Sequence, residues 1–103
     1  MIADKMANLE IHIQNCMKAG IDKQVCEKIN KWMDEPSSWI PGCRHRQYRH
    51  SLEDCTSIAN QFHDHLKEQA ILACKIHIRD DCIESKEICK KSLPCKEVNN
   101  IMV

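Results

Sequence analysis

The most chemically varied part of the sequence is the run from Cys43 to His50, which carries a thiol, two imidazoles, three guanidinium groups and a phenol. Together with Cys55 downstream, its histidines form the pattern C-x-H-x4-H-x4-C. Thiolate sulfur and imidazole nitrogen are both ligands that zinc accepts, and four of them in one short segment are enough to surround an ion. The segment therefore predicts a zinc site with these ligands: Cys43, His45, His50 and Cys55.

This pattern resembles the zinc knuckle of nucleic-acid-binding proteins, whose ligands follow the order C-x2-C-x4-H-x4-C. Here the first gap is one residue shorter, and a histidine stands in place of the second cysteine. Cys55 also falls inside a predicted helix, where a knuckle has a loop. The resemblance implies a compact zinc site carried by residues 43–55.

A second set of metal ligands combines His50 with residues much further along the chain. Asp80 and Asp81 follow His77 by three and four residues, so the three side chains share one face if the segment is helical. Imidazole and carboxylate groups together bind divalent metals. These residues therefore join the predicted metal ligands. His12, by contrast, lies between two isoleucines of an N-terminal helix and is expected on the surface.

The stretch from His50 to His77 also resembles a segment of the HD-type phosphohydrolases. Those enzymes place a histidine, a His-Asp doublet and a distant aspartate around metal ions in an all-α fold. In this sequence His77 is followed by isoleucine, and the doublet His63-Asp64 comes earlier in the chain. The resemblance implies a metal-dependent phosphohydrolase-like domain as one alternative function.

Three arginines of the same run indicate phosphate as a second kind of ligand. Arg44, Arg46 and Arg49 flank Tyr48. Guanidinium groups bind phosphate oxygens in a bidentate manner, and an aromatic ring stacks on a base. The alternative is that these arginines pair with nearby carboxylates and only solvate a loop. The formal net charge of zero at pH 7 gives the chain no overall attraction to nucleic acid, so any basic surface must be local.

Eight cysteines are the strongest compositional signal. In a secreted chain this short an even number would imply a disulfide framework, but the missing secretory signal argues against one. Cys16 and Cys26 lie about equally far from the turn at Gly20, so an antiparallel helical hairpin would make them disulfide candidates. Their C-x9-C spacing resembles half of the twin C-x9-C hairpins of the mitochondrial intermembrane space. For the other cysteines, free thiols, disulfides and metal ligation all stay open.

Helical periodicity indicates how these residues are positioned. Apolar stripes and caps predict four helices with these approximate bounds: 2–19, 22–35, 51–79 and 81–91. The third has a predicted break near residues 63–65. Pro, Ser and Gly mark the interval 34–50 as a long irregular connection. The sequence therefore predicts an all-α fold in a single domain, residues 1–103, whose first two helices form an antiparallel hairpin.

Composition and the chain ends complete the functional prediction. Aromatic residues make up only 4% of the chain, so disulfides, a metal or a homodimer are expected to add stability. The N-terminus lacks the apolar core of a secretory signal, and no apolar run reaches the ~20 residues of a membrane span. Both observations favour the cytoplasm, whereas a mature domain with an added Met1 would be secreted.

The predicted function is a small intracellular metal-binding protein, with zinc or another divalent ion as its cofactor. One alternative is a disulfide-stapled interaction module without catalytic activity. The other is the phosphohydrolase-like domain. The thiol state separates the first two functions, because zinc-binding thiolates and disulfide sulfurs exclude each other.

Overall fold

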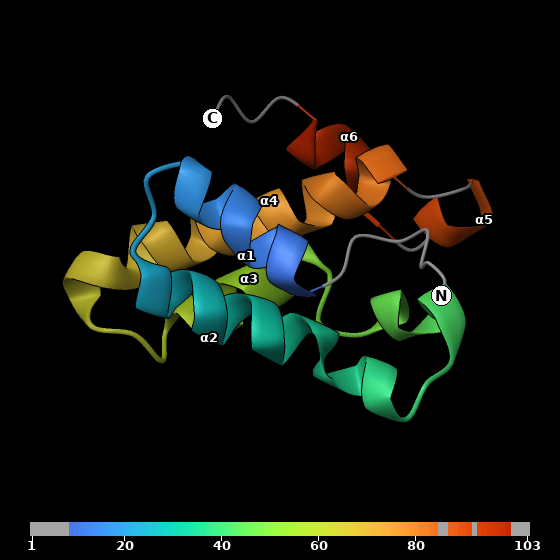
Figure 1. The fold of residues 1–103 in the computed structure, drawn as a ribbon, viewed down its shortest axis with the longest axis horizontal. Helices are drawn as coiled ribbons and strands as arrows, with labels where there is room; N and C mark the ends of the chain where they lie inside the picture. Colours follow the sequence, from blue (N-terminus) through green and yellow to red (C-terminus); the bar gives the residue numbers. More distant parts are fainter. Residues whose placement is uncertain (1–8, 85–86, 92, 100–103) are drawn as a thin grey trace.

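The computed structural model describes residues 9–84, 87–91 and 93–99, and within these residues all regular structure is helical (Figure 1). The α-helices are α1 (Leu9–Lys18), α2 (Lys23–Asp34), α3 (Leu52–Ala59), α4 (Lys67–Glu84), α5 (Glu87–Lys90) and α6 (Cys95–Val98). Short 3-10 helices occupy Glu35–Ser38, Gly42–Gln47 and Asp64–Leu66. The all-α prediction is confirmed, although the described residues form six α-helices instead of four.

The N-terminal hairpin is specified by local sequence signals at its turn and at the start of α2. Gly20 adopts a φ of +87°, a conformation that favours glycine and that ends α1. Asp22 caps α2, since its side chain accepts a hydrogen bond of 2.8 Å from the backbone N–H of Gln24. The two helices pack against each other, and a disulfide joins Cys16 to Cys26 as expected. The predicted start of the first helix, residues 2–8, lies outside the described residues.

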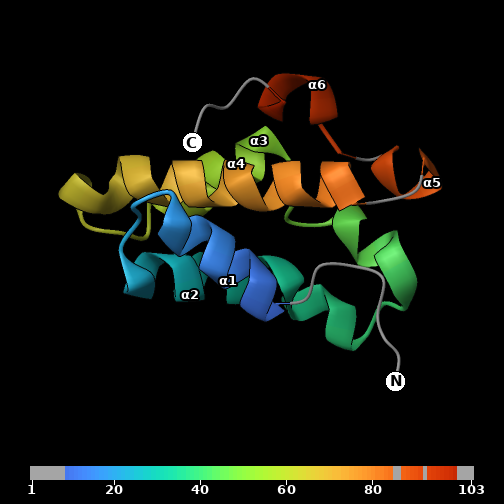
Figure 2. The same ribbon diagram turned by 45° about the horizontal axis from the view of Figure 1, so that its top comes forward.

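The central element is α4, which packs against α1, α2, α3 and α6 (Figure 2). Its apolar residues do not form one stripe, because neighbours surround the helix on several sides. Ala70, Ala73, Ile76 and Ile78 are all fully buried at 0% exposure. Small side chains near the start of α4 allow close approach of its neighbours. The helix therefore brings any polar residue on its inner faces into the core.

The second half of the chain departs from the predicted helices. Ser51 and Asp54 form a capping box at the start of α3, and the predicted break near residues 63–65 is observed, although it is wider than predicted: α3 ends at Ala59 and α4 begins only at Lys67. A fourth helix beginning at Asp81 is wrong, because α4 continues to Glu84. Asp81 does not start a helix, since it is buried within α4 and paired with residues from other elements.

Four disulfides use all eight cysteines: Cys16–Cys26, Cys43–Cys89, Cys55–Cys74 and Cys82–Cys95. The last three join the connection before α3 to α5, α3 to α4, and α4 to α6. Such a framework is typical of oxidising compartments and argues against the cytoplasmic prediction. Among the described helices, none combines the length and the apolar character that crossing a bilayer requires.

Candidate metal centre

Three side chains converge in the core of the protein. His50 lies directly before α3, while His77 and Asp81 lie one turn apart on α4. Each residue is only 1% exposed. The two Nε2 atoms of His50 and His77 are 3.2 Å apart, and each lies 3.4 Å from Oδ2 of Asp81. Three potential metal-binding atoms therefore form a nearly equilateral triangle, and the sequence-predicted ligands His50, His77 and Asp81 are brought together.

The far side of each imidazole ring fixes which nitrogen faces the centre. Nδ1 of His50 lies 2.7 Å from the carbonyl oxygen of Tyr48, and Nδ1 of His77 lies 2.6 Å from Oδ1 of Asn30. Nδ2 of Asn30 donates to the carbonyl oxygen of Cys26 at 2.7 Å, which orients the amide. Oxygens that only accept require a proton on each Nδ1. In the neutral rings, both Nε2 lone pairs therefore point into the triangle.

This arrangement requires positive charge at its middle. Two nitrogen lone pairs and a carboxylate oxygen repel one another at 3.2–3.4 Å unless a cation lies among them. Burial lowers the pKa of His50, which favours its neutral, metal-binding form. Tetrahedral zinc with bonds of about 2.0–2.1 Å holds its ligand atoms about 3.3–3.4 Å apart. The observed triangle matches one face of such a tetrahedron.

Asp34, at the end of α2, is the next donor to the centre. Its Oδ1 lies 3.2 Å from Nε2 of His77 and 3.9 Å from Nε2 of His50. Burial would raise the pKa of this carboxyl, but the adjacent His45 and His77 hold it well below its usual range. The side chain of Asp34 is 20% exposed, so this edge of the centre opens toward solvent. Sequence reasoning missed Asp34 as a ligand, because only the tertiary fold brings the end of α2 to α4.

His45 supports Asp34 from the outside. Its Nε2 lies 3.4 Å from Oδ1 of Asp34, and its Nδ1 lies 2.9 Å from the carbonyl oxygen of Gly42. Burial would lower the pKa of His45, but the bonds with Asp34 and Gly42 raise it above its ordinary value. His45 therefore adjoins the centre as the partner of a ligand, not as a member of the triangle.

The outer oxygen of Asp81 is held by two further residues. Arg46 donates to Oδ1 of Asp81 at 2.9 Å, and Nε2 of His12 lies 3.3 Å from the same oxygen. Burial would raise the pKa of Asp81, but the histidines around it keep that pKa well below its usual range. Because Oδ1 is occupied from outside, Oδ2 is turned toward His50 and His77.

The surface prediction for His12 is wrong. The residue is 2% exposed, and its ring stacks on that of His77 with centroids 3.8 Å apart. Burial alone would lower its pKa, but the neighbouring carboxylates of Asp80 and Asp81 raise the pKa to about 9. One sequence signal pointed to this position, since His12 precedes the buried Cys16 by one helical turn.

The predicted cysteine ligands require correction. Cys43 is bonded to Cys89 and Cys55 to Cys74, so neither sulfur is a thiolate for zinc. The C-x-H-x4-H-x4-C site is therefore wrong as a four-ligand unit. Asp80 also stands apart from the triangle: its Oδ2 accepts a hydrogen bond of 3.0 Å from Asn15, on the side of His12.

The predicted phosphate clamp does not form either. Arg46 is turned into the core, where it is 2% exposed and paired with Asp81. Arg49 donates to the backbone of Trp32 at 2.8 Å and to Glu35 at 2.6 Å. Arg44 is exposed. Because the arginines face different surroundings, the alternative of pairing with nearby carboxylates describes Arg46 and Arg49 better.

Comparison with known proteins assigns no function to the chain, so its function must be inferred from the geometry of this centre. No protein-family model matches the chain, and no curated protein or solved structure shows significant similarity to it. The metal ligands of HD-type enzymes cannot be carried over, because the doublet His63-Asp64 is exposed between α3 and α4.

Proposed function

We propose that this protein is a disulfide-stapled helical module of an oxidising compartment that holds one divalent metal ion in its core. The observation that carries the proposal is the pair of Nε2 atoms of His50 and His77, which face each other at 3.2 Å with both Nδ1 atoms engaged by acceptors. The ligands are His50, His77 and Asp81, and Asp34 is the donor that completes the set.

Zinc fits this ligand set best. Imidazole nitrogen and carboxylate oxygen both suit it, and a four-ligand site of this kind is tetrahedral. Separations of 3.2–3.4 Å among His50, His77 and Asp81 agree with that geometry, and Oδ1 of Asp34 lies 3.2 Å from His77 and 3.9 Å from His50. Calcium and magnesium prefer oxygen ligands, and two imidazoles disfavour them. Zinc also undergoes no redox change, which suits a protein whose cysteines are all oxidised.

The ion serves a structural role in this proposal. The side chains of His50 and His77 are 0% exposed and that of Asp81 is 1% exposed, so three of the four ligands are closed to solvent and only the edge at Asp34, whose side chain is 20% exposed, faces it. The ligands come from the end of α2, the connection before α3, and α4. One ion would therefore join three segments and neutralise the carboxylates of Asp34 and Asp81, in addition to the four disulfides.

A shared proton is the competing cation. It would bridge the two Nε2 atoms as an N–H···N hydrogen bond and give the centre one positive charge. A proton shared by the two nitrogens accounts less well for the position of Asp81, because Oδ2 of Asp81 lies 3.4 Å from each of them. The two cations differ in what they predict, because a proton leaves the centre indifferent to chelators and to added zinc.

Zinc titration of matched variants tests the proposal. Oxidised protein without a histidine tag is treated with a chelator, dialysed, and titrated with zinc by calorimetry. We expect one equivalent to bind to the parent protein and to His63→Gln, whose histidine is exposed. His50→Gln and His77→Gln should each abolish stoichiometric binding, while circular dichroism and thiol assays verify that they remain folded and oxidised. Equal binding by all variants, or none by the parent protein, would overturn the proposal.

A further inference from the structure

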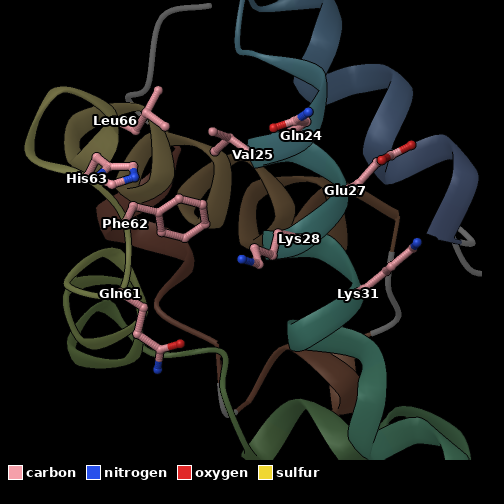
Figure 3. A pocket seen from close by; sticks show the side chains of 9 residues that line it. All are labelled: Gln24, Val25, Glu27, Lys28, Lys31, Gln61, Phe62, His63 and Leu66. Atoms are coloured by element: carbon pink, nitrogen blue, oxygen red, sulfur yellow. The ribbon is translucent and has the colours of Figure 1, made fainter.

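A second feature of the molecule lies away from the metal centre, in a groove between α2 and the α3–α4 connection (Figure 3). Its cavity volume of about 590 Å³ falls in the range of small-molecule sites. The residues that line it are Gln24, Val25, Glu27, Lys28, Lys31, Gln61, Phe62, His63 and Leu66. None of these residues belongs to the metal centre, so the groove needs an explanation of its own.

The groove contains an apolar patch with a cation beside it, among polar side chains from both walls. Val25 is buried on α2, and Phe62 and Leu66 face it as half-buried side chains from the connection. Lys28 reaches from α2 toward Phe62, with Nζ 5.7 Å from the ring centroid. Lys31 also lines the groove, but Figure 3 shows its ammonium group on the opposite side of α2 from that of Lys28. A ligand in the groove would therefore meet the ammonium group of Lys28 beside an apolar patch.

The charge of Lys28 is not neutralised within the groove. Glu27, the acidic residue among those that line it, points away from Lys28 (Figure 3). Among the described residues, no carboxylate forms an ion pair with Lys28. An ammonium group against an apolar surface is best complemented by an anionic group whose remainder is apolar.

Disulfides hold both walls of the groove in place. Cys16–Cys26 fastens α2 to α1, one residue beyond Val25. Cys55–Cys74 joins α3 to α4, the two helices between which the connection runs. A groove with fixed walls loses little conformational entropy when a ligand binds. The site is therefore preformed, as small-molecule sites usually are.

We infer that this groove binds small amphipathic carboxylates. The carboxylate of the ligand lies at the ammonium group of Lys28, and its apolar part packs against Phe62, Leu66 and Val25. This binding does not depend on the metal centre, since the two sites share no residue. The groove thus provides the stapled module with a ligand site, and the ion and the disulfides make the module rigid.

Calorimetric titration with octanoate, below its micelle-forming concentration, tests the inference in the oxidised full chain. A ligand of this size should saturate the protein with a Kd below about 1 mM. Lys28→Gln should weaken octanoate binding about fivefold, whereas Lys31→Gln, a matched charge removal on the same helix, should change it less than about twofold. The parent protein should bind octanol more weakly than octanoate. Lys28→Gln should bind the two ligands with equal affinity.

Three results would overturn the inference. The first is the absence of saturable octanoate binding. The second is equal affinity for octanoate and octanol, which would mean that Lys28 does not recognise the carboxylate. The third is an equal loss of affinity in Lys28→Gln and Lys31→Gln, which would indicate attraction by overall charge. Circular dichroism of both variants verifies that neither exposed substitution disturbs the fold.

Discussion

His50 and His77 turn their Nε2 atoms toward each other at 3.2 Å, while the Nδ1 atom of each ring is engaged by an oxygen acceptor. Two residues that are 27 positions apart thus present lone pairs to one point in the core. The carboxylate of Asp81 faces the same point from one turn beyond His77. A metal ion at this point would convert repulsion among the three groups into coordination.

Removal of the metal should destabilise the protein. Binding to the native state alone adds about 2.7 kcal/mol to the free energy of unfolding when free zinc is 100 times its Kd. Thermal unfolding with excess zinc should therefore occur at a higher Tm than unfolding with a chelator. Magnesium at the same concentration serves as the control, because the ligand set disfavours it. A Tm that is identical in zinc and in chelator would contradict the prediction.

Asn30 should act as a positioning residue for His77. Its Oδ1 is the acceptor for Nδ1 of His77 at 2.6 Å, and loss of such a partner typically lowers metal affinity about 10- to 100-fold. Asn30→Leu removes the acceptor at similar volume, so zinc titration should report a weaker Kd. Asn60→Leu, at an exposed position, is the matched control. An unchanged Kd in Asn30→Leu would show that the tautomer of His77 is set by other contacts.

His12 should make the stability of the zinc-free protein depend on pH. Asp80 and Asp81 face its ring, which stacks on His77, and its pKa rises from 6.5 to about 9 on folding. A raised pKa stabilises the fold fully below pH 6.5, and this contribution is lost as the pH rises through about 9. The free energy of unfolding should fall on the order of 3 kcal/mol across this window.

Denaturant unfolding at several pH values measures this effect. His12→Gln should flatten the profile between pH 6.5 and about 9. The control is His65→Gln, because His65 is exposed. A parent profile that rises through this window, or a His12→Gln profile as steep as the parent, would contradict the assignment.

The Cys43–Cys89 disulfide should support both the fold and the metal centre. It closes a sequence separation of 46 residues and anchors the connection that carries His45 and His50. The loop-entropy model assigns it about 4 kcal/mol, against about 3 kcal/mol for the shorter loop of Cys16–Cys26. Replacing the first pair with alanine should lower both stability and zinc affinity.

Replacing Cys16 and Cys26 with alanine is the matched control. This pair holds the turn end of the α1–α2 hairpin, and neither sulfur lies in the metal centre; Cys26 supports the centre only through its backbone carbonyl, which alanine retains. Stability should fall while the zinc Kd changes less than in the first double variant. If the two double variants lost zinc affinity equally, the connection before α3 would have no special role in holding His50.

Local signals allowed the N-terminal half of the fold to be predicted. Gly20, the Asp22 cap and the apolar stripes fix the α1–α2 hairpin within one stretch of sequence, and the hairpin brings Cys16 to Cys26. The start of α3 at Ser51 follows from its capping box. By contrast, the end of α3 at Ala59 has no strong breaker, since helical periodicity continues beyond it.

The candidate site was predictable only where its residues are close in sequence. The spacing of His77 and Asp81 reveals a shared helix face, and this turn carries two of the three central ligands. Asp34 and His12 join through tertiary packing of α1 and α2 on α4, which no spacing encodes. The other three disulfides also depend on tertiary packing. Eight cysteines allow about 105 pairings, so the sequence alone could not select the right one.

Native mass spectrometry distinguishes a zinc ion from a proton between His50 and His77. The protein is oxidised, carries no histidine tag, and is exposed to equimolar zinc before desalting. The account predicts a mass lowered by about eight hydrogens, two for each of the four disulfides, and raised by one zinc ion. His77→Gln should show the same hydrogen deficit without the zinc increment. A metal-free parent protein with the full hydrogen deficit would contradict the account, because the cation between His50 and His77 would then be a proton.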